Sequence, residues 1–174
     1  MSFNLQPVHL RNELVALNPL MESDLALLYP LAADPLVWEQ HPNPNRYRQA
    51  DFETYFQGAM ASKGAFLVVH AQTGEPLGCT RFLDYDASAR VVQIGYTFFG
   101  RNYWGKGFNP ATKRLMLDYA FQFVDRVEFY VGINNLRSRI AMERLGAVQT
   151  GTAEVAYYGE ATKMNVIYTI TRQS

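Results

Sequence analysis

The chain has 174 residues, of which 48% are hydrophobic and 14% aromatic, which is enough to fold as one domain spanning residues 1–174. Its formal net charge is zero, so no overall field attracts it to nucleic acid or to an anionic membrane. The single cysteine, Cys79, excludes an intrachain disulfide and a thiolate cluster for zinc, and we expect no metal site.

The N-terminal segment lacks the apolar stretch of a signal peptide, and no apolar run approaches the length of a membrane span. We therefore expect a cytoplasmic protein with neither a membrane nor a nucleic acid among its partners. The composition is equally compatible with a monomer and with a homodimer.

The first third of the chain predicts a strand near residues 14–17 and two helices, near 22–33 and 51–62. Pro30 should kink the first helix or end it near Tyr29. Residues 41–48 (HPNPNRYR) form a loop, because two prolines interrupt them. Since such loops often line binding sites, His41 and the flanking aromatic residues Trp38 and Tyr47 are candidate substrate-binding residues.

A meander of strands follows, near residues 65–71, 77–83 and 91–99. Beyond it lie a long helix, a strand near 127–133, a short helix capped by Asn135 and ending at Gly146, and two closing strands near 147–158 and 163–171. This pattern predicts a mixed sheet with helices packed on it, which is compatible with either the α/β or the α+β class.

Residues 91–124 read as a strand, a glycine-bearing loop and a helix in direct succession. Asn109 is the expected N-cap of the helix and Pro110 its first residue. Backbone N–H groups at such a helix start can bind phosphate, and Gly105 and Gly107 would let the backbone approach a ligand closely. Lys106 adds positive charge.

Three interpretations fit this loop. The first is a nucleotide triphosphate site, since residues 100–107 nearly spell G-x-x-x-x-G-K-[ST], but Gly107 replaces the hydroxyl residue that would hold magnesium. The second is a turn that only connects a strand to a helix. The third is a coenzyme A site, and it depends on a resemblance.

Two sequence blocks carry this resemblance. The run Tyr103–Phe108 (YWGKGF) follows Ile94-Gly95-Tyr96 and precedes a long apolar helix, and residues 135–138 (NLRS) are followed by residues 143–147 (ERLGA). Both blocks, in this order and spacing, resemble the acetyl-CoA-binding motifs of GNAT N-acetyltransferases, most closely those of the RimJ/RimL-type branch. With the flanking strands, the resemblance covers nearly the whole chain.

The resemblance implies a mixed α/β (α+β) GNAT-like acyl-CoA N-acyltransferase fold, with a central, mostly antiparallel sheet and two splayed parallel strands, here 93–99 and 127–133. It also implies acetyl transfer from acetyl-CoA, without a metal, to a primary amine on a protein N-terminus or a small molecule. The residues that it places at the cofactor are Tyr96, Thr97, Phe98, Asn102, Trp104, Gly105, Lys106, Gly107, Phe108, Asn135 and Ser138.

Catalytic roles are less determined. Many GNAT enzymes have a tyrosine acid where this chain has Met142, so Ser138 is the candidate that meets the leaving thiolate, unless it only hydrogen-bonds at the helix start. Glu39, beside Trp38, is the first candidate for the base, with Glu154, His41 and a water relay as alternatives.

The sequence does not identify the amine that accepts the acetyl group. RimJ/RimL-like relatives often have a basic residue near Glu154 and an aspartate near Asn165, so this chain inverts one charge and neutralises the other, and its acceptor is expected to differ. A non-catalytic sensor or adaptor that binds coenzyme A is the alternative function.

Overall fold

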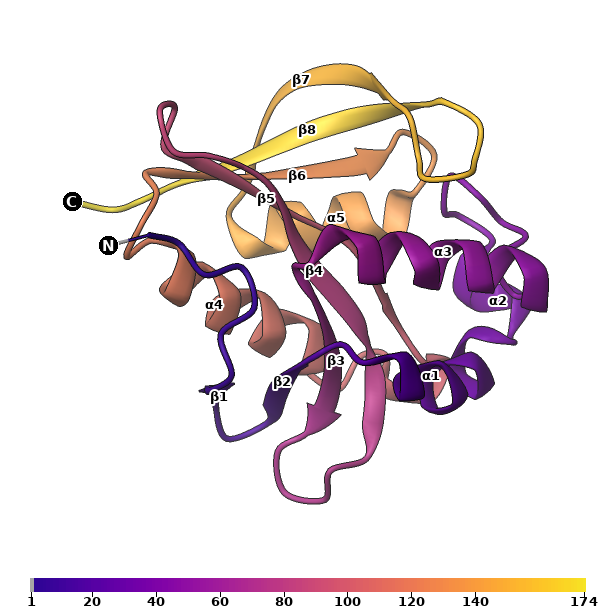
Figure 1. The fold of residues 1–174 in the computed structure, drawn as a ribbon. Helices are drawn as coiled ribbons and strands as arrows, with labels where there is room; N and C mark the ends of the chain where they lie inside the picture. The colour runs from indigo at the N-terminus through magenta and orange to yellow at the C-terminus, as the bar shows by residue number, and fades with distance from the viewer. Residues whose placement is uncertain (1) are drawn as a thin grey trace.

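The structure is a computed structural model that describes residues 2–174. Within this range eight strands form one sheet: β1 (Leu10–Arg11), β2 (Val15–Pro19), β3 (Ala65–His70), β4 (Pro76–Asp86), β5 (Val91–Phe99), β6 (Arg126–Gly132), β7 (Val148–Val155) and β8 (Lys163–Thr171). Their order in the sheet is β1-β2-β3-β4-β5-β6-β8-β7 (Figure 1). Every neighbouring pair is antiparallel except β5 and β6, so the predicted mixed, mostly antiparallel sheet is confirmed.

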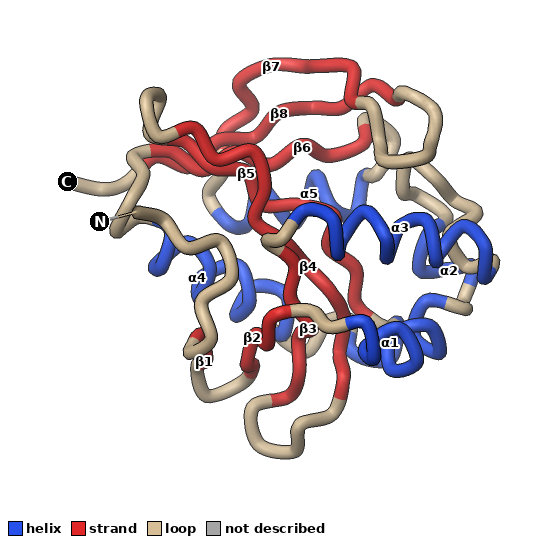
Figure 2. The backbone as a smooth tube through the Cα atoms, viewed as in Figure 1, coloured by secondary structure: helices blue, strands red, loops and turns tan. Residues whose placement is uncertain are grey.

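Helices cover both faces of this sheet (Figure 2). They are α1 (Leu25–Ala32), α2 (Pro35–Trp38), α3 (Gln49–Ser62), α4 (Phe108–Ala120) and α5 (Leu136–Leu145), with short 3-10 turns at Glu22–Asp24 and Arg101–Tyr103. Residues of α4 and α5 pack into one apolar core, and residues of α1, α2 and α3 pack into a second. None of the helices within residues 2–174 has the length and apolar character needed to cross a membrane.

The parallel strands β5 and β6 diverge after a short paired segment. Their register joins Val91, Val92 and Gln93 to Arg126, Val127 and Glu128 and goes no further. Beyond this point β5 stays paired only with β4, and β6 only with β8. The predicted splay is therefore confirmed, and it leaves one backbone edge of each strand facing the gap.

Helix α1 continues through Pro30 to Ala32. Of the two predicted alternatives, a kink at Pro30 or an end near Tyr29, the end near Tyr29 is therefore wrong. Pro30 has no N–H to donate to the carbonyl of Ala26, one turn earlier. Both residues are exposed, so water can donate to that carbonyl instead.

Helix α4 begins two residues earlier than predicted, at Phe108 instead of Pro110. Its N-cap is Gly107, in the left-handed conformation at φ 85°, and Asn109 makes no capping hydrogen bond. The helix starts at Phe108 because that ring is buried and anchors the first turn. Pro110 becomes the third helical residue, where its missing N–H has no intrahelical partner to lose.

Candidate active site

A cavity of about 620 Å³ opens where β5 and β6 part. Its walls come from six segments: the free edge of β5, the end of β6, the loop and first turns of α4, helix α5, the end of β7 with Tyr157, and the end of α2 with the loop that follows it. These segments are distant in the sequence, and they meet at the gap that the divergence of β5 and β6 creates. The volume falls within the roughly 300–1,000 Å³ that is usual for small-molecule and cofactor sites.

The loop before α4 is built for close approach of a ligand to its backbone. Gly105 and Gly107 have φ values of 71° and 85°, which side chains rarely adopt. A Cβ added at Gly105 would meet nothing within 4 Å, and one at Gly107 would meet only Leu14 Cδ1, at 4.0 Å. The loop is therefore open on the side of the added Cβ atoms, and the first turn of α4, which has no side-chain cap, can bind an anion there.

Several basic residues line the cavity, among them Lys113, Arg114, Arg137 and Arg144. The guanidinium of Arg137 lies 4.0 Å from the ring centre of Trp104, whose indole N–H donates to the Phe99 carbonyl at 3.0 Å. Positive charge and an open helix start together fit the phosphates of coenzyme A.

Asn109 lines the cavity, and its side-chain oxygen is buried without a hydrogen-bond partner among the described residues.

Strand β5 bends at Tyr96, beside the gap. Tyr96 has a φ of 53°, in the left-handed region, and the register with β4 shifts between Cys79 and Arg81. The hydroxyl of Tyr55 donates to the Tyr96 carbonyl, and the Arg81 guanidinium lies 3.9 Å from the Tyr96 ring centre. These contacts hold the strained residue in place and thereby set the direction of the strand edge that faces the cavity.

The first turn of α5 places Ser138, with its hydroxyl group, at the cavity. Asn135 is the N-cap, and its side-chain oxygen accepts from the backbone N–H of Ser138 at 3.3 Å. Ser138 contributes its backbone to this cap, while its side chain lines the cavity one turn before the buried Met142. The capping role and a role of the hydroxyl at the cavity are thus compatible.

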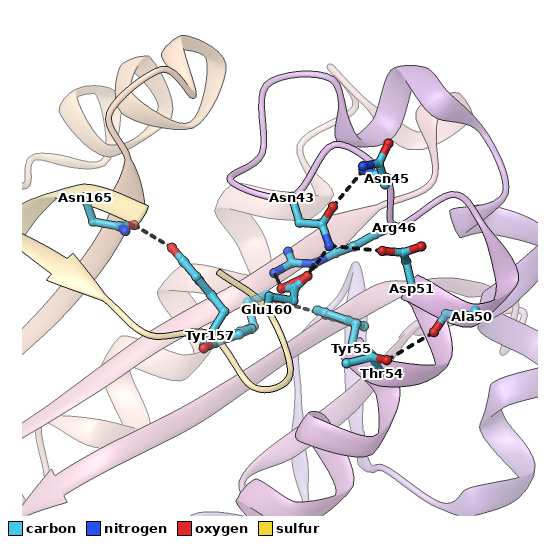
Figure 3. A network of polar contacts seen from close by, with 11 residues as sticks. Asn43, Asn45, Arg46, Ala50, Asp51, Thr54, Tyr55, Tyr157, Glu160 and Asn165 are labelled. Carbon is cyan, nitrogen blue, oxygen red and sulfur yellow. Dashed lines mark hydrogen bonds and ion pairs between the residues drawn. The ribbon is translucent and has the colours of Figure 1, made fainter. Parts of the chain in front are cut away.

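A buried ion pair borders the cavity at the loop after α2, where Arg46 lines it (Figure 3). Arg46 Nη2 lies 2.5 Å from Glu160 Oε1, and Asn43 also donates to the Glu160 carboxylate. The Arg46 guanidinium lies between 5.2 and 5.6 Å from the ring centres of Trp38, Tyr55 and Tyr157. This pair fastens the turn between β7 and β8 onto the loop after α2.

His41, in the same loop, also lines the cavity, with its ring 4.9 Å from that of Trp38. Burial, followed by the charges of Arg46 and Arg137, holds the pKa of His41 well below its ordinary value. The imidazole is therefore neutral near pH 7. The environment that keeps it neutral disfavours any positive charge placed beside it.

Most of the predicted cofactor residues line the cavity: Tyr96, Thr97, Phe98, Trp104, Gly105, Gly107, Phe108, Asn135 and Ser138. Asn102 and Lys106 are exposed residues of the same loop and do not line it. Of the predicted substrate-binding residues, His41 lines the cavity, whereas Tyr47 does not. Glu39 is exposed and lies outside the lining.

The expectation that Trp38 lines the site is corrected. Its side chain is fully buried, and its indole N–H donates to the Ala32 carbonyl at 2.8 Å. It packs against Phe98 and Tyr55 in the core beneath α1, α2 and α3. The ring supports His41 from behind rather than facing a ligand.

Sequence reasoning missed Arg46, Arg81 and Lys113. Lys113 could have been found, because it lies at helical spacing with the buried residues Met116, Leu117 and Ala120 of α4. Neither arginine has such a signal. Their surroundings are built from segments far apart in the chain, including the contact of Arg46 with Glu160 across 114 positions.

Comparison with known proteins agrees with this geometry. The family described as "Acetyltransferase (GNAT) domain" matches residues 15–148. YdaF, a provisionally named ribosomal N-acetyltransferase of Bacillus subtilis (strain 168), is 28% identical over 97 residues, which cover 55% of this chain and 52% of YdaF. The chain thus matches about half the length of that relative.

Solved structures share the fold. A GNAT-family protein from Chromobacterium violaceum ATCC 12472 superposes with a TM-score of 0.80 at 22% identity, covering 93% of this chain and 85% of the other. The Microcin C7 self immunity acetyltransferase MccE, solved with acetyl-CoA and AMP, has a TM-score of 0.73 at 16% identity, covering 92% and 94%. Because the family match extends over most of the described residues, this chain belongs to the GNAT acetyltransferase domain family.

Proposed function

We propose that the chain transfers the acetyl group of acetyl-CoA directly to a primary amine. The observation that supports this best is one cavity whose lining includes both an open, basic loop and helix start and the residues His41 and Tyr157. The only cysteine, Cys79, is buried, does not line this cavity, and has a pKa that burial raises to about 11. Transfer through a cysteine thiolate is therefore disfavoured.

Each part of the cavity has a role in this proposal. The backbone of Gly105–Phe108 and the surrounding cations hold the phosphates of coenzyme A. An N–H on the free edge of β5 near Tyr96–Phe98 stabilises the charge that develops on the thioester oxygen. The hydroxyl of Ser138 donates to the leaving thiolate, because Met142 cannot.

The attacking amine must be neutral, and the described lining of the cavity contains no carboxylate base. Neither aspartate nor glutamate occurs among the described residues that line it, and Glu39 lies outside. The low pKa of His41 makes it a weak proton acceptor. We propose instead that burial and the nearby guanidinium groups lower the pKa of the bound amine itself, which then releases its proton to water.

This environment favours one class of acceptor. A polyamine or an aminoglycoside carries several ammonium groups, which need carboxylate partners that the lining lacks. An α-amino group has a pKa near about 7.7–8.0, against about 10.4 for an alkyl amine, so it is neutralised more easily. We therefore propose an α-amino group, on a peptide N-terminus or an amino acid, as acceptor. The name of YdaF, a ribosomal N-acetyltransferase, supports the peptide.

The test is turnover of acetyl-CoA against a panel of amines: peptides with free N-termini, amino acids, spermidine and an aminoglycoside. Release of free thiol with the peptides or amino acids, and little with the polycations, is the expected result. Turnover with the polycations alone would contradict the proposed acceptor class. A chain that binds coenzyme A but turns over with none of these amines would instead support the sensor or adaptor function.

A further inference from the structure

Lys113 is a buried amine to which the proposed transfer gives no chemical step, only a share of the positive charge around coenzyme A. It lies on the inward face of α4, is 4% exposed, and lines the cavity beside β5. Its Nζ donates to Thr97 Oγ1 at 2.6 Å. None of its hydrogen bonds or ion pairs within the described residues involves a carboxylate, so its charge is not neutralised by a partner.

Hydroxyl groups hold this amine in place. Lys113 Nζ contacts Thr97 Oγ1 at 2.6 Å, and Thr97 Oγ1 is hydrogen-bonded to Thr80 Oγ1 at 2.8 Å, where either hydroxyl can donate. When a neutral Lys113 donates one N–H to Thr97, its lone pair is free.

Burial makes the neutral form accessible. Desolvation lowers the pKa of Lys113 to about 7, and no charged side chain contributes to this shift. At neutral pH a substantial fraction of Lys113 is therefore an uncharged amine. The other lysines of the chain, Lys63, Lys106 and Lys163, are exposed.

We propose that Lys113 is a site of self-acetylation by the acetyl-CoA held in the same cavity, an inference that rests on the proposed function. The lone pair of Nζ attacks the thioester carbonyl carbon, the new N–C bond forms as the C–S bond breaks, and the thiolate leaves as free coenzyme A. The proton that the nitrogen loses goes to this thiolate, so no further reactant is needed.

Acetylation of Lys113 would inhibit the enzyme by weakening its binding of acetyl-CoA. An acetylated lysine cannot carry charge, and its added atoms occupy the cavity beside Thr97. Both changes weaken binding of the next anionic acetyl-CoA. Self-acetylation is thus expected to accumulate when no acceptor amine is available and to lower the affinity for coenzyme A at least several-fold.

The experiment uses the purified full chain with acetyl-CoA and no acceptor, followed by intact mass spectrometry and peptide mapping. We expect one acetyl group, on Lys113, with an initial rate that levels off above about pH 8, whereas an exposed lysine would keep gaining neutral amine up to about pH 10. Lys113→Met should abolish the modification, and Lys63→Arg should leave it unchanged. Thermal stabilisation by coenzyme A is measured on the same samples.

Two results would overturn the inference. One is acetylation confined to the exposed lysines. The other is an unmodified chain that coenzyme A nevertheless stabilises, and this result would leave the proposed function intact. If coenzyme A does not stabilise the chain at all, the proposed function fails, and the inference fails with it.

Discussion

The guanidinium of Arg46 and the carboxylate of Glu160 form an ion pair with side-chain exposures of only 3% and 10%. The pair joins the loop after α2 to the turn between β7 and β8, which are adjacent in space but distant in sequence (Figure 3). Since Arg46 also lines the cavity, the pair fixes one wall of the proposed acceptor pocket.

Removing one partner of this pair should be strongly destabilising. Glu160→Ala leaves the Arg46 guanidinium buried without its carboxylate, which typically costs about 3–5 kcal/mol. Urea unfolding measures this loss. The control is Asp125→Ala, which breaks the exposed ion pairs with Arg90 and Arg172 and should change the free energy of unfolding far less. Equal effects of the two changes would mean that Arg46 is not effectively desolvated.

Binding of coenzyme A should require glycine at position 107. Gly107→Val forces a branched side chain into a φ of 85° and blocks approach to the backbone at the start of α4. We expect the rise in melting temperature with coenzyme A, which grows with the logarithm of its concentration, to disappear. ATP with magnesium should stabilise the unchanged chain much less.

A control for backbone strain is available in the same chain. Gly74 has a φ of 75° in the turn between β3 and β4, and it does not line the cavity. Gly74→Val should lower the melting temperature but keep the shift caused by coenzyme A. If both variants lose that shift, general destabilisation rather than the loop geometry accounts for the result.

Ser138→Ala should lower kcat about tenfold to a thousandfold and change the affinity for coenzyme A only slightly, as expected for a hydrogen bond made in the transition state. The substitution isolates the hydroxyl, because the backbone N–H of residue 138 can still donate to Asn135. Steady-state kinetics with the best amine measures the effect. Unchanged turnover would assign Ser138 to capping alone.

The sequence predicted the elements more accurately than their side-chain environments. Strands β5 and β8 have the predicted bounds, because their β-branched and aromatic residues leave little choice of conformation. The glycine loop was predicted from its residues, and the splay from the family resemblance. The start of α4 was misplaced because Asn109 is a good N-cap residue, and the burial of Phe108 overrode that local preference.

Side chains that meet through tertiary packing were harder to predict. Trp38 looked like part of a binding loop, yet α1, α3 and β5 enclose it completely. Arg46 was missed because its partner, Glu160, lies in the final hairpin. Such positions are decided by which segments the sheet order brings together, and local patterns carry no information about that order.

Trp38→Ala should therefore act on stability rather than on binding. Truncating a buried tryptophan typically costs about 3–5 kcal/mol of unfolding free energy. The stabilisation by coenzyme A should persist, because Trp38 does not line the cavity. Denaturant unfolding and the KM for the amine are measured together. A variant that keeps its stability but shows a raised KM would place the ring in contact with substrate.

Lys113 should make the stability of the chain depend on pH in a defined direction. Its pKa is about 7 in the folded chain and about 10.4 when unfolded, so the unfolded chain binds more protons between these values. Stability therefore rises with pH across this range. The buried ammonium group lowers the free energy of unfolding by its full amount below about pH 7, and this loss decreases as the pH rises toward about 10.

Lys113→Met removes this destabilisation, so its gain in the free energy of unfolding should be largest at low pH. We expect the variant to gain about 2–3 kcal/mol more stability over the unchanged chain at about pH 6 than at about pH 9, by the conversion of about 1.4 kcal/mol per pKa unit. Urea unfolding of both proteins at both pH values measures the difference. Lys63→Met, at an exposed position, should show no such dependence. A gain that is the same at both pH values would mean that Lys113 keeps an ordinary pKa in the folded chain, and its proposed nucleophilic character would lose its basis.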